Sequence, residues 1–168
     1  MRWLIDGYNV IRRDAELRDR EQASLAAGRT ALLALVGRAA SRVSDNFTIV
    51  FDGAQRGGGE AAPRPGRVEV VFSRPPESAD DTLRRLAATL REGAIVVSSD
   101  RAVQDAARRA HAVAVSAEQF VDAIDGPTVD ELDDDDGDER PDARRGPSRR
   151  PSREARDVAR VLRRLRER

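Results

Sequence analysis

Four aspartates stand where the strands of a parallel sheet are expected to end, and their residue type suits metal-ion chemistry. These residues are Asp6, Asp52, Asp80 and Asp100. The carboxyl ends of parallel strands share one edge of a sheet, so we expect the four carboxylates to converge although they are dispersed in sequence. At a separation of about 5 Å and an effective dielectric of ~20, each pair repels by roughly 3 kcal/mol. A cluster of this kind favours a bound cation.

The donor type narrows the choice of ion and of reaction. Carboxylate oxygens favour a hard divalent ion such as Mg²⁺ or Mn²⁺, which activates water and stabilises the charge that develops on phosphorus. This predicts phosphodiester hydrolysis without a histidine base. Each acid also has an alternative role as a helix cap or turn residue. Asp81 fits the third position of a capping box, and Asp100, after Ser98 and Ser99, could cap the next helix.

Short apolar runs and helical periodicity predict the elements that carry these acids. Runs the length of buried strands occur at 3–5, 47–51, 68–72, 95–97 and 112–115, and helical stretches at 21–42, 79–91, 101–110 and 117–124. Ser78 and Ser116 each begin a capping-box sequence, which supports two of the helix starts. The alternation of strands and helices predicts an α/β fold, a three-layer sandwich with a mostly parallel central sheet.

Composition excludes several kinds of chemistry. All 30 basic residues are arginine, and the chain has no lysine, no cysteine and a single histidine, His111. These counts exclude a Walker-type phosphate loop, a Schiff-base lysine, a thiolate nucleophile, a cysteine zinc site and a two-histidine nuclease. The first apolar run ends before Asp6 and is too short for a signal peptide or a membrane span. We therefore expect a soluble, cytoplasmic protein with no membrane partner.

The sequence divides into a domain and a charged tail. Residues 1–124 have the apolar content for one core, and we assign the catalytic domain to them. Residues 125–139 contain nine acids and no base, and residues 140–151 are basic and rich in proline. This composition predicts a disordered linker over residues 125–151. In residues 152–168, apolar side chains at helical spacing predict an Arg-rich amphipathic helix: Val158, Val161, Leu162 and Leu165. The glycine-rich stretch 56–66 is predicted to be a mobile loop.

Several of these acids lie in short motifs that follow one another along the chain. The segments are LIDGYNVI at 4–11, VFDG at 50–53, RVEVVFS at 67–73, ESADD at 77–81 and VSSD at 97–100. Together they resemble the successive motifs of the YacP-like NYN branch of the PIN-domain superfamily, over residues 1–124. The resemblance implies a PIN-like fold and divalent-metal-dependent endoribonuclease activity on RNA. It also implies the ribosome as a partner, because members in some bacteria are linked to ribosome-associated mRNA cleavage.

The resemblance assigns roles to the acids. Asp6, Asp80 and Asp100 match the positions of metal ligands, and Asp52 completes the acidic catalytic pocket. Asn9 matches the family's asparagine and would orient a carboxylate or the scissile phosphate.

Three further residues near these motifs are candidates for substrate binding. Ser99 could hydrogen-bond a phosphate, or instead cap the next helix. Arg12 and Arg13 follow the first motif and could contact phosphates, or instead form part of a solvated surface in this arginine-rich chain. For each of them the structural alternative stays open.

Two other functions fit part of the sequence. A haloacid-dehalogenase-type phosphatase also begins with an aspartate after its first strand, but it needs a second aspartate two residues later and a lysine. Here Tyr8 holds that position and the chain has no lysine. A non-catalytic RNA- or ribosome-binding module, with the charged tail as the binding element, is the stronger alternative. The acids argue against it, because a surface for a polyanion gains nothing from clustered negative charge.

Overall fold

A single parallel sheet forms the centre of the protein, in a computed structural model that describes residues 1–53, 66–126 and 152–166. The strands are β1 (Arg2–Asp6), β2 (Asn46–Phe51), β3 (Val68–Phe72), β4 (Ala94–Val97) and β5 (Val113–Val115). They are hydrogen-bonded in the order β3-β2-β1-β4-β5, and every neighbouring pair is parallel. The predicted α/β fold with a parallel central sheet is therefore confirmed.

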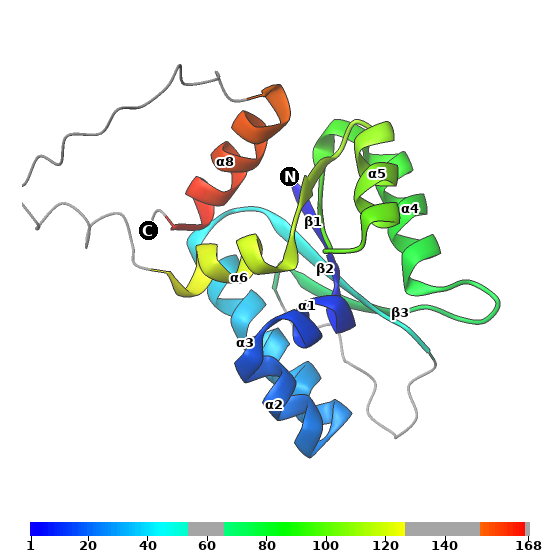
Figure 1. Cartoon of the computed structure of the whole chain (residues 1–168), viewed down its shortest axis with the longest axis vertical. Helices are drawn as coiled ribbons and strands as arrows, with labels where there is room; N and C mark the ends of the chain where they lie inside the picture. The colour runs from blue at the N-terminus through cyan, green and yellow to red at the C-terminus, as the bar shows by residue number, and fades with distance from the viewer. Residues whose placement is uncertain (54–65, 127–151, 167–168) are drawn as a thin grey trace, which may run out of the picture.

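Helices cover both faces of the sheet and make the predicted three layers (Figure 1). On one face, α4 (Ala79–Leu90) and α5 (Arg101–Arg109) bury Leu4, and a short 3-10 turn (Arg91–Gly93) joins α4 to β4. On the other face, Trp3 and Ile5 pack among α1 (Gly7–Arg13), α3 (Leu25–Arg42), α6 (Ala117–Asp125) and α8 (Arg153–Arg166). Successive residues of a strand point to opposite faces, which explains this division. Within the described ranges, no helix is long and apolar enough to cross a membrane.

The region between β1 and β2 differs from the prediction of a single helix over 21–42. The chain enters α1 directly after β1, continues as α2 (Ala15–Ala23) and breaks at Ser24 before α3. Polar side chains cap each start: the Asp14 carboxylate accepts from the Leu17 amide at 2.8 Å, and the Ser24 hydroxyl from the Ala27 amide at 3.0 Å. Because Leu17 is the only residue of α2 that is buried, this helix has no apolar periodicity to reveal it.

The C-terminal helix α8 packs on the same face as α3 and α6. Its Val161, Leu162 and Leu165 are buried in the core cluster of that face. The Arg42 guanidinium donates to the Leu165 carbonyl at 3.3 Å, which ties α8 to α3. Most of the predicted linker and loop, at 127–151 and 54–65, lies outside the described residues. The division of the chain at Ile124 therefore stays a prediction.

Candidate active site

Asp6 occupies the junction between the central strand β1 and α1. It is 8% exposed, its Oδ1 accepts a hydrogen bond from the Asn9 amide at 3.2 Å, and its Oδ2 accepts one from the Ser98 hydroxyl at 3.0 Å. The next residue is Gly7, at which a Cβ would lie 2.3 Å from the Phe51 ring. A side chain at position 7 would therefore displace the Phe51 ring, and glycine lets the chain turn into α1 close to β2.

The environment of Asp6 disfavours its charged form. Burial is the main cause that raises the pKa of Asp6 from the ordinary 3.8 to about 6, and the charges of Asp80 and Asp52 raise it further. The hydrogen bonds from Asn9 and Ser98 act in the opposite direction but are outweighed. A buried carboxylate beside two other acids is an arrangement that a cation would stabilise.

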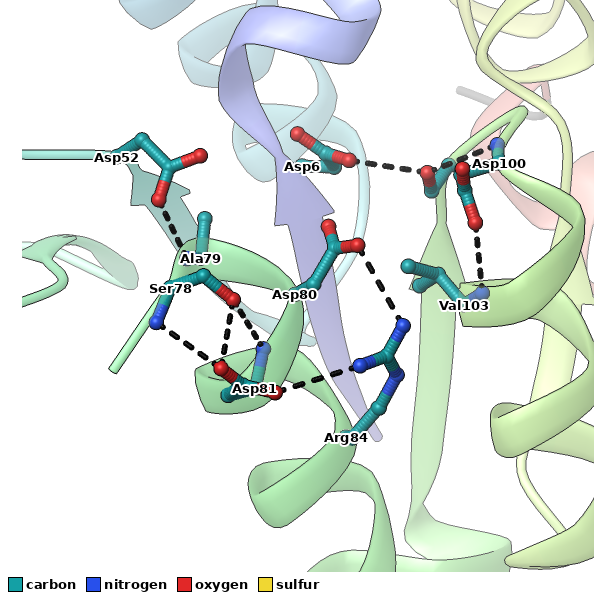
Figure 2. A network of polar contacts seen from close by, with 10 residues as sticks. Asp6, Asp52, Ser78, Ala79, Asp80, Asp81, Arg84, Asp100 and Val103 are labelled. Atoms are coloured by element: carbon teal, nitrogen blue, oxygen red, sulfur yellow. Dashed lines mark hydrogen bonds and ion pairs between the residues drawn. The ribbon is translucent and has the colours of Figure 1, made fainter. Parts of the chain in front are cut away.

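Asp52 and Asp80 meet at the start of α4. Oδ1 of Asp52 accepts from the Ala79 amide at 2.6 Å and from the Ser73 hydroxyl at 3.1 Å, so the end of β2 holds the first turn of α4. This contact places Asp80 beside the sheet edge (Figure 2). Burial raises the pKa of Asp80, the nearby Arg84 guanidinium opposes this, and Asp100 and Asp52 add to the rise. Oδ2 of Asp80 lies 3.5 Å from the Arg84 guanidinium.

Asp100 lies on the other side of Asp6 and caps α5. Its Oδ1 accepts from the Val103 amide at 3.0 Å, so the capping role and the place at the sheet edge coincide. The buried Ser98 joins the two acids: its hydroxyl accepts from the Asp100 amide at 3.2 Å and donates to Asp6. The four predicted aspartates thus lie around one edge of the sheet, and we call this region the acid edge (Figure 2).

Three of the four predicted substrate-binding residues share one network beside the acid edge. Oδ1 of Asn9 accepts from the Ser99 amide at 2.8 Å. The Ser99 hydroxyl donates to Oε2 of Glu118 at 2.6 Å and accepts from the Ala117 amide at 3.0 Å. Oε1 of Glu118 lies 3.6 Å from the Arg13 guanidinium. Because the Asn9 carbonyl oxygen is engaged, its amide nitrogen is the atom available to a ligand.

Glu118 was not predicted from the sequence. The hydrogen bond from Ser99 is the main cause that lowers the pKa of Glu118. The only sequence signal was its place in the first turn of the capping-box helix α6, where acids are common for reasons of stability alone. Arg12, by contrast, lies 3.8 Å from Glu21 and stacks over the Tyr8 ring at 5.5 Å. Its assignment to substrate binding stays a prediction.

The sequence pattern of the YacP-like NYN domain family matches residues 3–164. The chain belongs to this family. The NYN domain has a PIN-like nuclease fold, as the resemblance of the motifs predicted. The match runs from β1 into α8 and so extends beyond residues 1–124, the range over which the motifs carried the resemblance.

Relatives of this NYN chain come from Bacillus subtilis. The protein described as "Uncharacterized protein YacP" of strain 168 is 32% identical over 87 residues, which is 52% of this chain and 51% of that protein. The matched segment therefore spans about half the length of that relative. A crystal structure of Rae1 (YacP) has a TM-score of 0.62 at 30% identity, covering 74% of this chain and 75% of that one. A crystal structure of a mutant of Rae1 (YacP) has a TM-score of 0.60 at 29% identity, and the match covers 73% of this chain and 76% of that one.

The acid edge of this NYN chain presents carboxylate oxygens that no other described residue engages. Across the described ranges, no group of three or more acidic or histidine side chains forms a ready-made metal site. Mg²⁺ is usually held by one or two carboxylates, with water and substrate phosphate completing its shell. Asp52 Oδ2, Asp80 Oδ1 and Asp100 Oδ2 make no hydrogen bond to another described residue. Oxygen donors of the required type are therefore present at the acid edge.

Proposed function

We propose that this chain is a divalent-metal-dependent endoribonuclease that hydrolyses phosphodiester bonds in RNA, either free or presented by the ribosome. The observation that carries the proposal is the buried carboxyl group of Asp6, whose pKa of about 6 reflects burial and the charges of Asp80 and Asp52. Acids with strongly perturbed pKa values cluster at functional sites. Membership of the YacP-like NYN family also supports the proposal of nuclease activity.

In this proposal Asp6, Asp80 and Asp100 hold the ion, and Asp52 fixes the start of α4 that presents Asp80. A bound Mg²⁺ or Mn²⁺ would activate water and stabilise the negative charge that develops on phosphorus. Asp80 can bind the ion through Oδ1, and through Oδ2 as well if the contact of Oδ2 with Arg84 is exchanged. The pair is partly exposed, with 38% of the Arg84 side chain and 39% of the Asp80 side chain accessible to solvent, so it opposes the exchange only weakly.

The network beside the acid edge supplies donors for the substrate. The Asn9 amide nitrogen donates to a phosphate oxygen, because the Ser99 amide occupies the carbonyl oxygen of Asn9. Arg13 and Ser99 bind a neighbouring phosphate after exchange with Glu118. This contact between Arg13 and Glu118 is also open to solvent, with the side chains 54% and 46% exposed.

Cleavage of an end-labelled RNA by the purified protein tests the proposal. Mg²⁺ or Mn²⁺ should support cleavage, EDTA should abolish it, and Ca²⁺ should give weak or no turnover because its looser coordination positions water poorly. Asp6→Asn, Asp80→Asn and Asp100→Asn should each lower the rate at least about 100-fold. Asp19→Asn, on the exposed side of α2, is the matched control and should keep the wild-type rate.

Activity within a few-fold of wild type in all three acid-edge variants, or full activity in excess EDTA, would refute the metal-nuclease assignment. RNA binding without cleavage in Mg²⁺ or Mn²⁺ would instead support the alternative, a non-catalytic RNA- or ribosome-binding module.

A further inference from the structure

The carboxyl ends of four neighbouring strands form a row at the acid edge. In the sheet order β3-β2-β1-β4, Asp52 follows β2, Asp6 ends β1 and Asp100 comes shortly after β4. Figure 2 shows these three acids in the same order. One arginine stands at each end of the row: Arg74 comes shortly after β3, and Arg101 begins α5 directly after Asp100. Neighbouring strands lie about 4.8 Å apart, so the ends of β3 and β4 are separated by about 14 Å.

Arg74 presents a free cation on the β3 side of the row. Its side chain is exposed, and its guanidinium makes no hydrogen bond or ion pair with another described residue. The preceding residue, Ser73, donates its hydroxyl to Asp52 at 3.1 Å, and the Arg74 carbonyl accepts from the Glu77 amide at 2.9 Å. These two contacts hold the backbone of Arg74 beside the acid edge. The acid nearest to it in sequence, Glu77, is paired with Arg85 at 2.9 Å, so it leaves the Arg74 guanidinium available to another anion.

Arg101 presents a free cation on the β4 side, at a position that helix stability disfavours. It is the first residue of α5, where the helix dipole repels a positive charge, and the first turn of α5 contains no acid to offset this repulsion. Its side chain is exposed, and its guanidinium has no hydrogen bond or ion pair with another described residue. Residues that break a local rule of stability without a compensating contact are expected at functional sites. A phosphate bound beside Asp100 would give this arginine the partner that the fold does not provide.

We propose that Arg74 and Arg101 bind the phosphates on the two sides of the bond that is cleaved, so that one RNA strand crosses the acid edge from β3 to β4. This inference rests on the proposed nuclease function and adds the path of the substrate to it. The two cations lie outside the row of acids, so each attracts a flanking phosphate while the acids and their ion act on the central one. Contacts to phosphate position RNA of any base sequence.

Two double variants with the same change in net charge test the path. Arg74→Gln with Arg101→Gln removes both cations from the acid edge. Arg91→Gln with Arg109→Gln, the control, removes two exposed arginines from the opposite edge of the sheet, before β4 and at the end of α5. Affinity for a fluorescent single-stranded RNA is measured in Ca²⁺, which can occupy the acids with weak or no turnover. Loss of two phosphate contacts should flatten the slope of log affinity against log salt by about 1.4 and weaken binding roughly tenfold at low salt, while the control stays within about twofold.

A neutral methylphosphonate in place of one phosphate identifies each contact separately. The RNA has one mapped cleavage site, and the substitution is placed on the 5′ or the 3′ side of it. One of the two positions should slow cleavage by the wild type severalfold but have no further effect on Arg74→Gln. The other position should show the same relation to Arg101→Gln. Such paired losses that do not add are expected only where the arginine and that phosphate are in contact.

Thermal unfolding separates substrate binding from a structural role. Arg101→Gln removes an unfavourable charge from the amino end of α5, so its Tm should not fall. Arg109→Gln removes a favourable charge from the carboxyl end of the same helix and should lower the Tm slightly. If the Tm of Arg101→Gln fell together with its RNA affinity, Arg101 would be a structural residue and the proposal would be wrong.

Two other outcomes would overturn the path. They are equal affinity and salt slope in the two double variants, and methylphosphonate effects that are the same in the wild type and in both single variants. If the wild type cleaves RNA and either result is obtained, the path fails while the nuclease assignment stands. If removal of Arg74 and Arg101 weakens RNA binding but the wild type never cleaves, the two arginines bind RNA and the nuclease assignment fails.

Discussion

Asp6→Asn should stabilise the protein near neutral pH in metal-free buffer, although it removes a central residue of the acid edge. The folded state raises the pKa of Asp6 from 3.8 to about 6, which corresponds to about 3 kcal/mol at 1.36 kcal/mol per unit. This carboxyl group favours folding only while it is protonated. Its contribution is complete below about pH 3.8 and is lost as the pH rises through about 6.

The asparagine side chain has nearly the same size and carries no charge. Its carbonyl oxygen can still accept from the Asn9 amide, but the bond from the Ser98 hydroxyl is lost, at a cost of about 1 kcal/mol. At about pH 7.5 we therefore expect the variant to be more stable than wild type by about 2 kcal/mol. At about pH 4.5, protonation of Asp6 raises the free energy of unfolding of the wild type by about 2 kcal/mol. The difference in stability between the wild type and the variant should therefore nearly vanish.

Urea unfolding in EDTA at both pH values measures this difference, and Asp19→Asn on the exposed side of α2 is the matched control for the removal of one carboxylate. The corresponding shift in Tm near neutral pH is roughly 4–8 °C. A variant that is less stable than wild type at about pH 7.5, or a difference that does not change with pH, would refute the account of Asp6 as a destabilised buried charge.

Two further substitutions test the contacts around the acid edge. Gly7→Ala places a Cβ 2.3 Å from the Phe51 ring and should lower the free energy of unfolding by about 2–3 kcal/mol in urea titrations. Gly37→Ala on α3, with nothing within 4 Å, should not lower it. Glu118→Gln keeps an acceptor for Ser99 but frees Arg13, so RNA affinity in EDTA should rise a few-fold and the salt slope should steepen by about 0.7. Unchanged affinity would mean that Arg13 does not contact RNA.

The parallel sheet and the helices on both of its faces were predictable, because the sequence signals for these elements are local. Each strand is a short apolar run, and the capping boxes at Ser78 and Ser116 are both present in the structure. The strand-end positions of Asp6, Asp52 and Asp100 followed from the same runs. Asp100 also shows that two interpretations held as alternatives can both be true, since it caps α5 while standing at the acid edge.

Other features could not be predicted, because they depend on contacts between distant segments. The helix α2 buries only Leu17, so apolar periodicity gave no sign of it, although Asp14 and Ser24 are cap residues that could have marked its limits. The contact of Glu118 with Ser99 joins α6 to the turn after β4. Arg84 approaches Asp80 one helical turn away, and its effect on the acid edge depends on how α4 is anchored by Asp52.

The distribution of charge explains why the proposed nuclease needs a binding surface apart from its acids. At about 10 Å and an effective dielectric of ~20, each carboxylate of the acid edge repels an RNA phosphate by about 2 kcal/mol. Two cations close to the acid edge are partly engaged, since Arg84 lies beside Asp80 and Arg13 beside Glu118. A bound cation reduces the repulsion at the scissile bond, but attraction along the strand must come from elsewhere.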